Sequence, residues 1–189
     1  MINDDHKFIF VHIHKTAGSS ITALLNNGKE KTEHQHKTIN QMINRENKDY
    51  FKFCFVRNPY DRLLSKYYYD LRISNIHKPG SVKNCNNFNE WVLKHSFRIN
   101  MVLPTQYSYV YDNYGNNLLD YIGRFENLEN DFKFIKDKLS IEQDLGHRNK
   151  NTLEKDSNYM KYYTSESIKI VNKVYENDFK YFNYDMFNL

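Results

Sequence analysis

The sequence predicts an α/β fold of three layers, in which helices flank a central parallel sheet. Two apolar runs, residues 7–14 and 50–56, have the composition of strands, and each is followed by a segment with helical spacing. The same order recurs from residue 121. Alternation of strand and helix is typical of a parallel sheet. The chain has 189 residues, which predicts a single domain over residues 1–189 that needs no disulfide or metal to fold.

The element boundaries follow from local signals. Residues 50–56 are apolar almost throughout, which indicates a central strand covered on both faces. Asn58 is a good N-cap and Pro59 a good first residue for the helix that follows. Strands are expected at 7–14, 50–56 and 121–125, and helices at 19–27, 38–47, 59–73, 88–95, 127–139 and 164–178.

The composition of the chain limits which kinds of molecule it can bind and in which cellular compartment it is expected. The net charge of +4 and the pI of about 8.8 are too mild for a nucleic-acid binder, but they fit a site for a small, highly charged anion or an acidic polymer. The alternative is an ordinary surface that happens to be basic. The two cysteines, Cys54 and Cys85, suggest no disulfide framework. No leader and no membrane span of about 18 apolar residues is evident. We therefore expect a cytoplasmic protein that binds no nucleic acid and has no membrane span. A chain from which a membrane anchor had been removed would look the same.

Residues 12–20, "HIHKTAGSS", join the first strand to the first helix and form a P-loop-like anion site. Gly18 allows an unusual φ or a close approach, two serines offer hydroxyls, and helix amides and Lys15 supply positive charge. The nucleotide-triphosphatase pattern Gly-x-x-x-x-Gly-Lys-Ser/Thr is absent. Arg57 stands where a kinase or ATPase would carry a metal-binding carboxylate, which disfavours that class. The alternative is a plain strand-to-helix turn capped by serines.

A second anion site is predicted at the end of the second strand. Arg57 ends that strand, and Ser65 lies two helical turns further on, so both can reach one phosphate. The alternative is a surface ion pair of Arg57 with Asp61 and a surface serine.

Four blocks together closely resemble the sulfotransferases that use 3′-phosphoadenosine-5′-phosphosulfate (PAPS). The resemblance is to their carbohydrate-type branch, which includes the heparan and chondroitin sulfotransferases and bacterial relatives. It covers most of the chain and is weakest over residues 72–100. The blocks are "HIHKTAGSS", "FKFCFVRNPYDRLLSKYYY", "IGRFENLENDF" (122–132) and "YYTSESIKIVNKVYENDFKYFNYD" (162–185).

The resemblance implies an enzyme that moves a sulfuryl group from PAPS to a hydroxyl acceptor, expected to be a saccharide, and releases 3′,5′-bisphosphoadenosine (PAP). It implies that Arg57 and Ser65 hold the 3′-phosphate, and that Lys15 also stabilises the leaving phosphate. No metal is expected. The alternative is a PAP- or nucleotide-binding protein of the same fold without transferase activity. The residues implied to hold the 5′-phosphosulfate are Lys15, Thr16, Ala17 (through its backbone), Gly18, Ser19 and Ser20.

The acceptor hydroxyl must lose its proton, and histidine is the usual base near neutral pH. Related sequences carry a histidine two residues before a threonine, which aligns with His36 and Thr38 and makes His36 the expected base. A shift of two residues would give the role to His34.

Other histidines and a late basic segment leave further alternatives open. His12 and His14 share one side of the first strand and could be core residues or line the loop. The two His-x-His pairs could also bind a transition metal. Arg148 and Lys150 in "GHRNKN" (146–151) could contact donor or substrate, or lie in a solvated loop. The tyrosines at 67–69 and 107–114 could stack on sugars or pack in the core.

Overall fold

The computed structural model describes residues 1–29, 32–73, 82–142 and 158–188, and it divides into two compact units. Unit 1 comprises Met1–Arg57 and Gln106–Lys150, and unit 2 comprises Asn58–Thr105 and Asn151–Leu189. The expectation of one domain over residues 1–189 stays a prediction. Arg148 and Lys150 lie outside the described residues.

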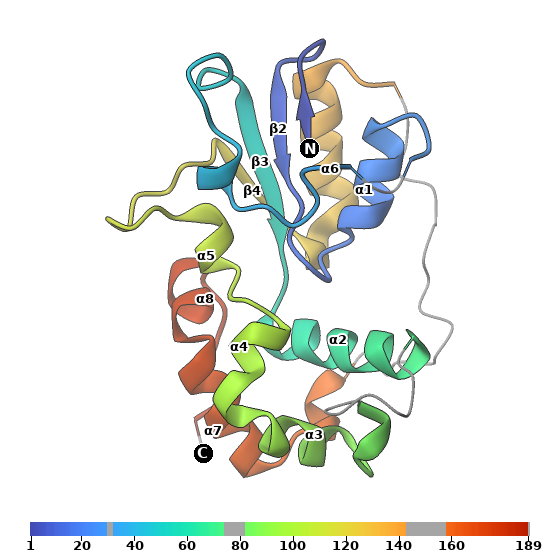
Figure 1. Cartoon of the computed structure of the whole chain (residues 1–189), viewed down its shortest axis with the longest axis vertical. Coiled ribbons are helices and arrows are strands. Elements are labelled where there is room, and N and C mark those ends of the chain that lie inside the picture. Colours follow the sequence, from blue (N-terminus) through green and yellow to red (C-terminus); the bar gives the residue numbers. More distant parts are fainter. Residues whose placement is uncertain (30–31, 74–81, 143–157, 189) are drawn as a thin grey trace. The chain divides into compact units, whose positions relative to one another are not determined.

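Unit 1 contains a four-stranded sheet in the order β1-β2-β3-β4 (Figure 1). Strands β2 (Phe8–Val11), β3 (Phe51–Val56) and β4 (Tyr121–Arg124) are parallel, as predicted. The fourth strand, β1 (Ile2–Asn3), pairs antiparallel with β2 and was not predicted, because two residues are too few to show an alternating pattern. The α/β fold with a central, mostly parallel sheet flanked by helices is confirmed.

Aromatic side chains fill one face of this sheet. Phe8, Phe10, Phe53 and Phe55 are fully buried against helices α1 (Gly18–Leu25) and α6 (Leu128–Leu139). The alternating residues on the opposite face are buried as well, as expected for a strand covered on both sides. These residues are Ile9, Val11, Cys54 and Val56.

The predicted helix over residues 38–47 is wrong. The structure has a single 3-10 turn there, η1 (Ile39–Gln41). Asn44 and Asn47 explain the difference, because each side-chain oxygen accepts the backbone N–H of the other residue, at 3.0 Å and 2.8 Å. Asparagine side chains that take backbone donors in this way compete with the helix.

Strand register places the carboxyl ends of the parallel strands at one edge of the sheet. Val11 pairs with Cys54 and Val56 pairs with Arg124. The segments that leave this edge are residues 12–17, Arg57 and the turn η4 (Phe125–Asn127). Ligands of open α/β sheets bind at this edge.

Unit 2 is helical around an aromatic core that includes Tyr60, Trp91 and Phe179. Its first helix begins as predicted, with the Asn58 side chain accepting the N–H of Tyr60 at 3.0 Å. The helix expected at 164–178 is two helices, α7 and α8, which break at Tyr175. The elements are α2 (Pro59–Ile73), η2 (Val82–Asn84), α3 (Phe88–Lys94), η3 (Ser96–Arg98), α4 (Ile99–Val102), η5 (Tyr159–Tyr162), α7 (Ser165–Val174) and α8 (Glu176–Tyr181).

One short helix of unit 1, α5 (Tyr107–Val110), was not predicted, and it contacts η1. Within the described ranges, the structure contains no helix that is long and apolar enough to cross a membrane.

Candidate active site

The loop between β2 and α1 is shaped by two left-handed residues, Lys15 (φ 68°) and Ala17 (φ 66°). The Thr16 hydroxyl donates a hydrogen bond to the Ile13 carbonyl at 3.0 Å and is fully buried, so this side chain fixes the loop. Helix α1 begins immediately afterwards, at Gly18. The Ser20 and Ile21 amides both donate to the Ala17 carbonyl, at 3.0 Å and 3.2 Å. The amides of Gly18 and Ser19 precede them at the start of the helix, where N–H groups can bind an anion.

Gly18 is required by a close approach rather than by an unusual φ. A Cβ at this position would lie 2.0 Å from Cδ2 of the His12 ring. The glycine therefore lets the His12 ring pack directly against the start of α1. The left-handed conformation that the sequence suggested for Gly18 falls on Lys15 and Ala17 instead.

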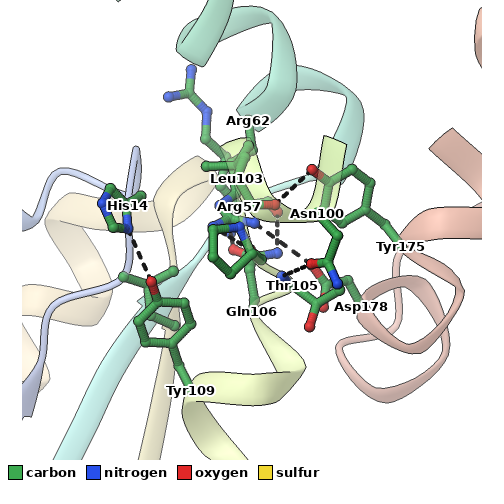
Figure 2. A network of polar contacts seen from close by, with 12 residues as sticks. His14, Arg57, Arg62, Asn100, Leu103, Thr105, Gln106, Tyr109, Tyr175 and Asp178 are labelled. Carbon is green, nitrogen blue, oxygen red and sulfur yellow. Dashed lines mark hydrogen bonds and ion pairs between the residues drawn. The ribbon is translucent and has the colours of Figure 1, made fainter. Parts of the chain in front are cut away.

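Arg57 is buried beside this loop. Its Nη1 donates to the Lys15 carbonyl at 3.0 Å, and its guanidinium lies 3.8 Å from the centroid of the Phe125 ring. The buried Gln106 side chain holds the Arg57 backbone with two hydrogen bonds of 2.8 Å, one to the N–H and one to the C=O (Figure 2). Arg57 is therefore not a surface residue, and unit 1 brings it together with Lys15.

Ser65 belongs to unit 2. It lies in α2, which begins two residues after Arg57, and only 5% of its surface is exposed. A buried polar side chain does not fit the alternative of a surface serine.

Three histidines form a cluster in unit 1. The rings of His14 and His36 stack in parallel, with centroids 3.4 Å apart, and the His12 ring meets His36 edge-on at 4.5 Å. Nδ1 of His14 lies 3.0 Å from the Tyr109 hydroxyl, and the two side chains point toward each other in Figure 2. Because His12 also packs on Gly18, the cluster adjoins the loop between β2 and α1.

The hydrogen bonds of His36 define its tautomer. Nδ1 of His36 lies 3.1 Å from the His12 carbonyl, which can only accept, so Nδ1 carries the proton. In the neutral ring Nε2 then has a free lone pair and can act as a base. Burial lowers the pKa of His36, which keeps the ring neutral near pH 7. The φ of His36, 64°, is also left-handed.

His34 lies in different surroundings from the other candidate bases. Its ring nitrogens contact the Glu33 carboxylate at 3.5 Å and the Lys37 ammonium at 3.4 Å. In the part of the chain that the structure describes, no three His, Cys, Asp or Glu residues are arranged to hold a metal ion.

Sequence reasoning missed two residues of this region, Gln106 and Phe125. Tyr109 was among the tyrosines at 107–114 that could stack on sugars or pack in the core, but its contact with His14 was not predicted. Phe125 lies in the recognisable segment "IGRFENL" and follows a predicted strand, so its position was within reach of the sequence. Gln106 and Tyr109 belong to a short segment without periodicity, and their partners lie 49 and 95 residues away in the chain.

Comparison with known proteins shows which family combines these features. The model of the sulfotransferase family matches residues 1–185, a range that includes the loop, Arg57, Ser65 and the histidine cluster. The chain belongs to the sulfotransferase family. It is also similar to an uncharacterized protein of Archaeoglobus fulgidus, with 34% identity over 113 residues, which are 59% of this chain and 84% of that protein. No solved structure matches the chain.

Family membership gives the general chemistry. Sulfotransferases move a sulfuryl group to an acceptor, and the reaction needs an anion site for the donor and a group that handles the acceptor proton. In this sulfotransferase, unit 1 supplies candidates for both in adjoining positions.

The histidine cluster makes the stability of this sulfotransferase depend on pH. Burial, His36 and His14 together lower the pKa of His12 to about 3, against 6.5 for an ordinary histidine. Below pH 6.5 the unfolded chain therefore takes up a proton that the folded chain refuses. We expect the free energy of unfolding to fall by roughly 2 kcal/mol between pH 7 and pH 5.

Urea unfolding at the two pH values measures this loss. His12→Gln removes the titrating ring, and the variant should lose less stability than the wild type over the same interval. Equal unfolding free energies of the wild type at pH 7 and pH 5 would contradict the prediction.

Proposed function

We propose that this protein transfers the sulfuryl group of PAPS to a hydroxyl of a saccharide. The observation that carries the proposal is the position of His36. Its ring has a fixed Nδ1–H and a free Nε2, and it is joined through His12 to the loop that resembles the 5′-phosphosulfate site. An anion site and a neutral base lie side by side, as an in-line displacement requires.

In the proposed reaction, Nε2 of His36 takes the proton of the acceptor hydroxyl as its oxygen attacks the sulfur. A new S–O bond forms to the acceptor, and the S–O bond to the 5′-phosphate of PAPS breaks. The phosphate of PAP leaves with the bonding electron pair and gains negative charge. The Lys15 ammonium and the first amides of α1 stabilise that charge.

The proposed donor site combines the loop with two further residues. Lys15, Thr16, Ala17, Gly18, Ser19 and Ser20 hold the 5′ end, and Arg57 and Ser65 hold the 3′-phosphate. Arg57 is supported by its burial and by its contact with the Lys15 carbonyl, which link it to the loop. Phe125 restrains the guanidinium by stacking on it.

Ligand-dependent melting tests the donor specificity. PAP binds the folded chain selectively and should raise its melting temperature. ATP should raise it less, because ATP lacks the 3′-phosphate that Arg57 and Ser65 are proposed to bind. A fluorescence melting series with equal concentrations of the two nucleotides, without added metal, makes the comparison. Equal stabilisation by ATP and PAP would contradict a 3′-phosphate site.

Replacing Arg57 tests the same site directly. Arg57→Ala should weaken PAP binding by roughly 1.5–3 kcal/mol, the contribution of a charge-assisted hydrogen bond to phosphate. Arg57→Lys keeps the charge but loses the planar fork, so its affinity should lie between those of the alanine variant and the wild type. Calorimetric titration with PAP gives both values. An unchanged dissociation constant in a folded Arg57→Ala variant would remove Arg57 from the donor site.

Sulfate transfer itself is tested with radiolabelled PAPS and a panel of hydroxyl acceptors. The proposal predicts labelled product with at least one saccharide. PAP binding without transfer to any acceptor would favour a nucleotide-binding protein of this fold instead.

A further inference from the structure

Unit 1 contains a groove of about 710 Å³. Two segments far apart in the sequence line it: the turn that follows His36 and the region around α5. The lining residues are Thr38, Asn40, Gln41, Tyr107, Ser108, Tyr111, Asp112, Asn113 and Tyr114.

Helix α5 connects the groove to the proposed base. Tyr109 is buried and contacts His14, which stacks on His36. Its neighbours Tyr107 and Ser108 line the groove instead. The opposite wall begins at Thr38, two residues after His36, and Asn40 Nδ2 donates to the Tyr111 carbonyl at 3.4 Å, which ties the walls together. Helix α5 and the segment that begins at His36 therefore contribute to both the groove and the histidine cluster.

The lining has the chemistry of a sugar site. The rings of Tyr107 and Tyr111 stack on each other almost in parallel, with centroids 4.4 Å apart, and form a flat aromatic block. Side-chain amides and hydroxyls make up most of the remaining wall. A pyranose offers a matching pattern, because it has apolar C–H faces and a rim of hydroxyls.

The charge of the lining distinguishes an uncharged saccharide from an acidic one as the ligand of the groove. Asp112 is the one charged side chain among the nine lining residues. Its carboxylate accepts the N–H groups of Tyr114 and Asn116 at 2.8 Å and the Asn116 side chain at 2.9 Å. These bonds, that of the Asn116 side chain foremost, lower the pKa of Asp112 and keep it ionised. Lys37 is adjacent in sequence to Thr38 but directs its ammonium to His34.

An acidic polysaccharide needs cations along its path, and this groove offers a carboxylate. The geometry points to a groove that binds the acceptor of sulfuryl transfer, with an uncharged saccharide as that acceptor. The inference rests on the proposed function and narrows it. It departs from the acidic polymer that the basic net charge also allowed.

The test compares saccharide probes of equal length on the full chain saturated with PAP. Chitotetraose, cellotetraose and maltotetraose are the uncharged probes, and unsulfated chondroitin tetrasaccharide is the anionic probe. Calorimetry measures each dissociation constant. We expect at least one uncharged probe to bind more tightly than the chondroitin probe, and Tyr111→Ala to weaken that binding roughly tenfold. Asp112→Asn should improve binding of the anionic probe.

A second groove variant and a control variant complete the test. Ser108→Trp adds bulk at an exposed position of the groove and should also weaken the uncharged probe, which covers the case of a Tyr111→Ala variant that does not fold. Tyr181→Ala, a partly exposed tyrosine of α8 in unit 2, is the matched control and should leave the dissociation constant unchanged.

The outcomes separate the inference from the proposed function. Tighter binding of the chondroitin probe, an unchanged constant in folded groove variants, or no binding of any uncharged probe would overturn the inference. Sulfate transfer from PAPS to chondroitin at a rate that the groove substitutions do not change would overturn the inference. The proposed function would then remain in place. Saccharide binding that depends on Tyr111, without any transfer from PAPS, would support the groove and contradict the transferase.

Discussion

His36→Ala is expected to lower the turnover of sulfate transfer by roughly 10²–10⁴, which corresponds to about 3–5 kcal/mol of barrier. The substitution removes the Nε2 lone pair that accepts the acceptor proton in the proposed reaction. PAP affinity should change little, because the proposed base acts on the acceptor and not on the nucleotide. The measurements are PAP calorimetry and initial rates with labelled PAPS on the same preparation.

Two matched variants make this result interpretable. His36 has a left-handed backbone, which asparagine tolerates better than alanine, so His36→Asn removes the base with less strain. His34→Ala removes the neighbouring histidine, whose ring contacts Glu33 and Lys37, and should keep near-normal turnover. Collapse of activity in the His34 variant and not in the His36 variants would transfer the role to His34. Loss of PAP binding in the His36 variants would make His36 part of the donor site.

The pH dependence of the rate has a defined sign. The base works only as a neutral ring, so activity should fall as pH decreases through the pKa of His36. Burial lowers that pKa, and the fall should therefore occur below the ordinary histidine value of 6.5. Activity that declines already above pH 7 on acidification would assign the proton transfer to another group.

The largest stability effect is expected in unit 2, where Arg62 and Asp178 are both fully buried. Nη1 of Arg62 lies 3.8 Å from Oδ2 of Asp178, and its Nη2 donates to the Pro104 carbonyl at 2.9 Å. The hydroxyl of Tyr175 donates to the Leu103 carbonyl at 2.8 Å in the same network (Figure 2). Removing one partner of a buried ion pair leaves a charge in a poorly solvating environment.

Asp178→Ala should therefore lower the free energy of unfolding by roughly 3–5 kcal/mol. Urea titration gives the value, and Glu176→Ala is the matched control, because Glu176 is an exposed carboxylate of the same helix, α8. The control should lie within about 0.5 kcal/mol of the wild type. Equal unfolding midpoints for the Asp178 variant and the wild type would show that the pair contributes no net stability.

The parts of the fold that the sequence predicted are those governed by local signals. Residues 50–56 form a strand because an apolar, aromatic run is stable only when covered on both faces, and α2 begins at Pro59 because Asn58 caps it. The helix predicted over residues 38–47 was wrong, because hydrophobic periodicity in the sequence does not reveal the hydrogen bonds that Asn44 and Asn47 exchange.

In the candidate site, too, the features that follow from local signals were predictable and those that depend on tertiary packing were not. The loop at residues 12–20 and Arg57 were predictable, because each follows a recognisable strand. The stacking of His14 on His36 and the contact with Tyr109 depend on tertiary packing, and residue types alone left the choice among four histidines open. The groove joins segments about 70 residues apart, so the sequence alone could not predict it. The importance of the Asp112 charge for the choice of saccharide follows only from its place in the lining of the groove.

The proposed reaction of this sulfotransferase moves the sulfuryl group of PAPS to a saccharide hydroxyl. The most direct measurement is one incubation with PAPS and a saccharide panel, without added metal, in which PAP and sulfated product are quantified together by mass spectrometry. We expect one equivalent of PAP for each equivalent of sulfated saccharide, and neither product in excess of background with His36→Asn. Binding of PAPS without PAP release, across the whole panel, would contradict it.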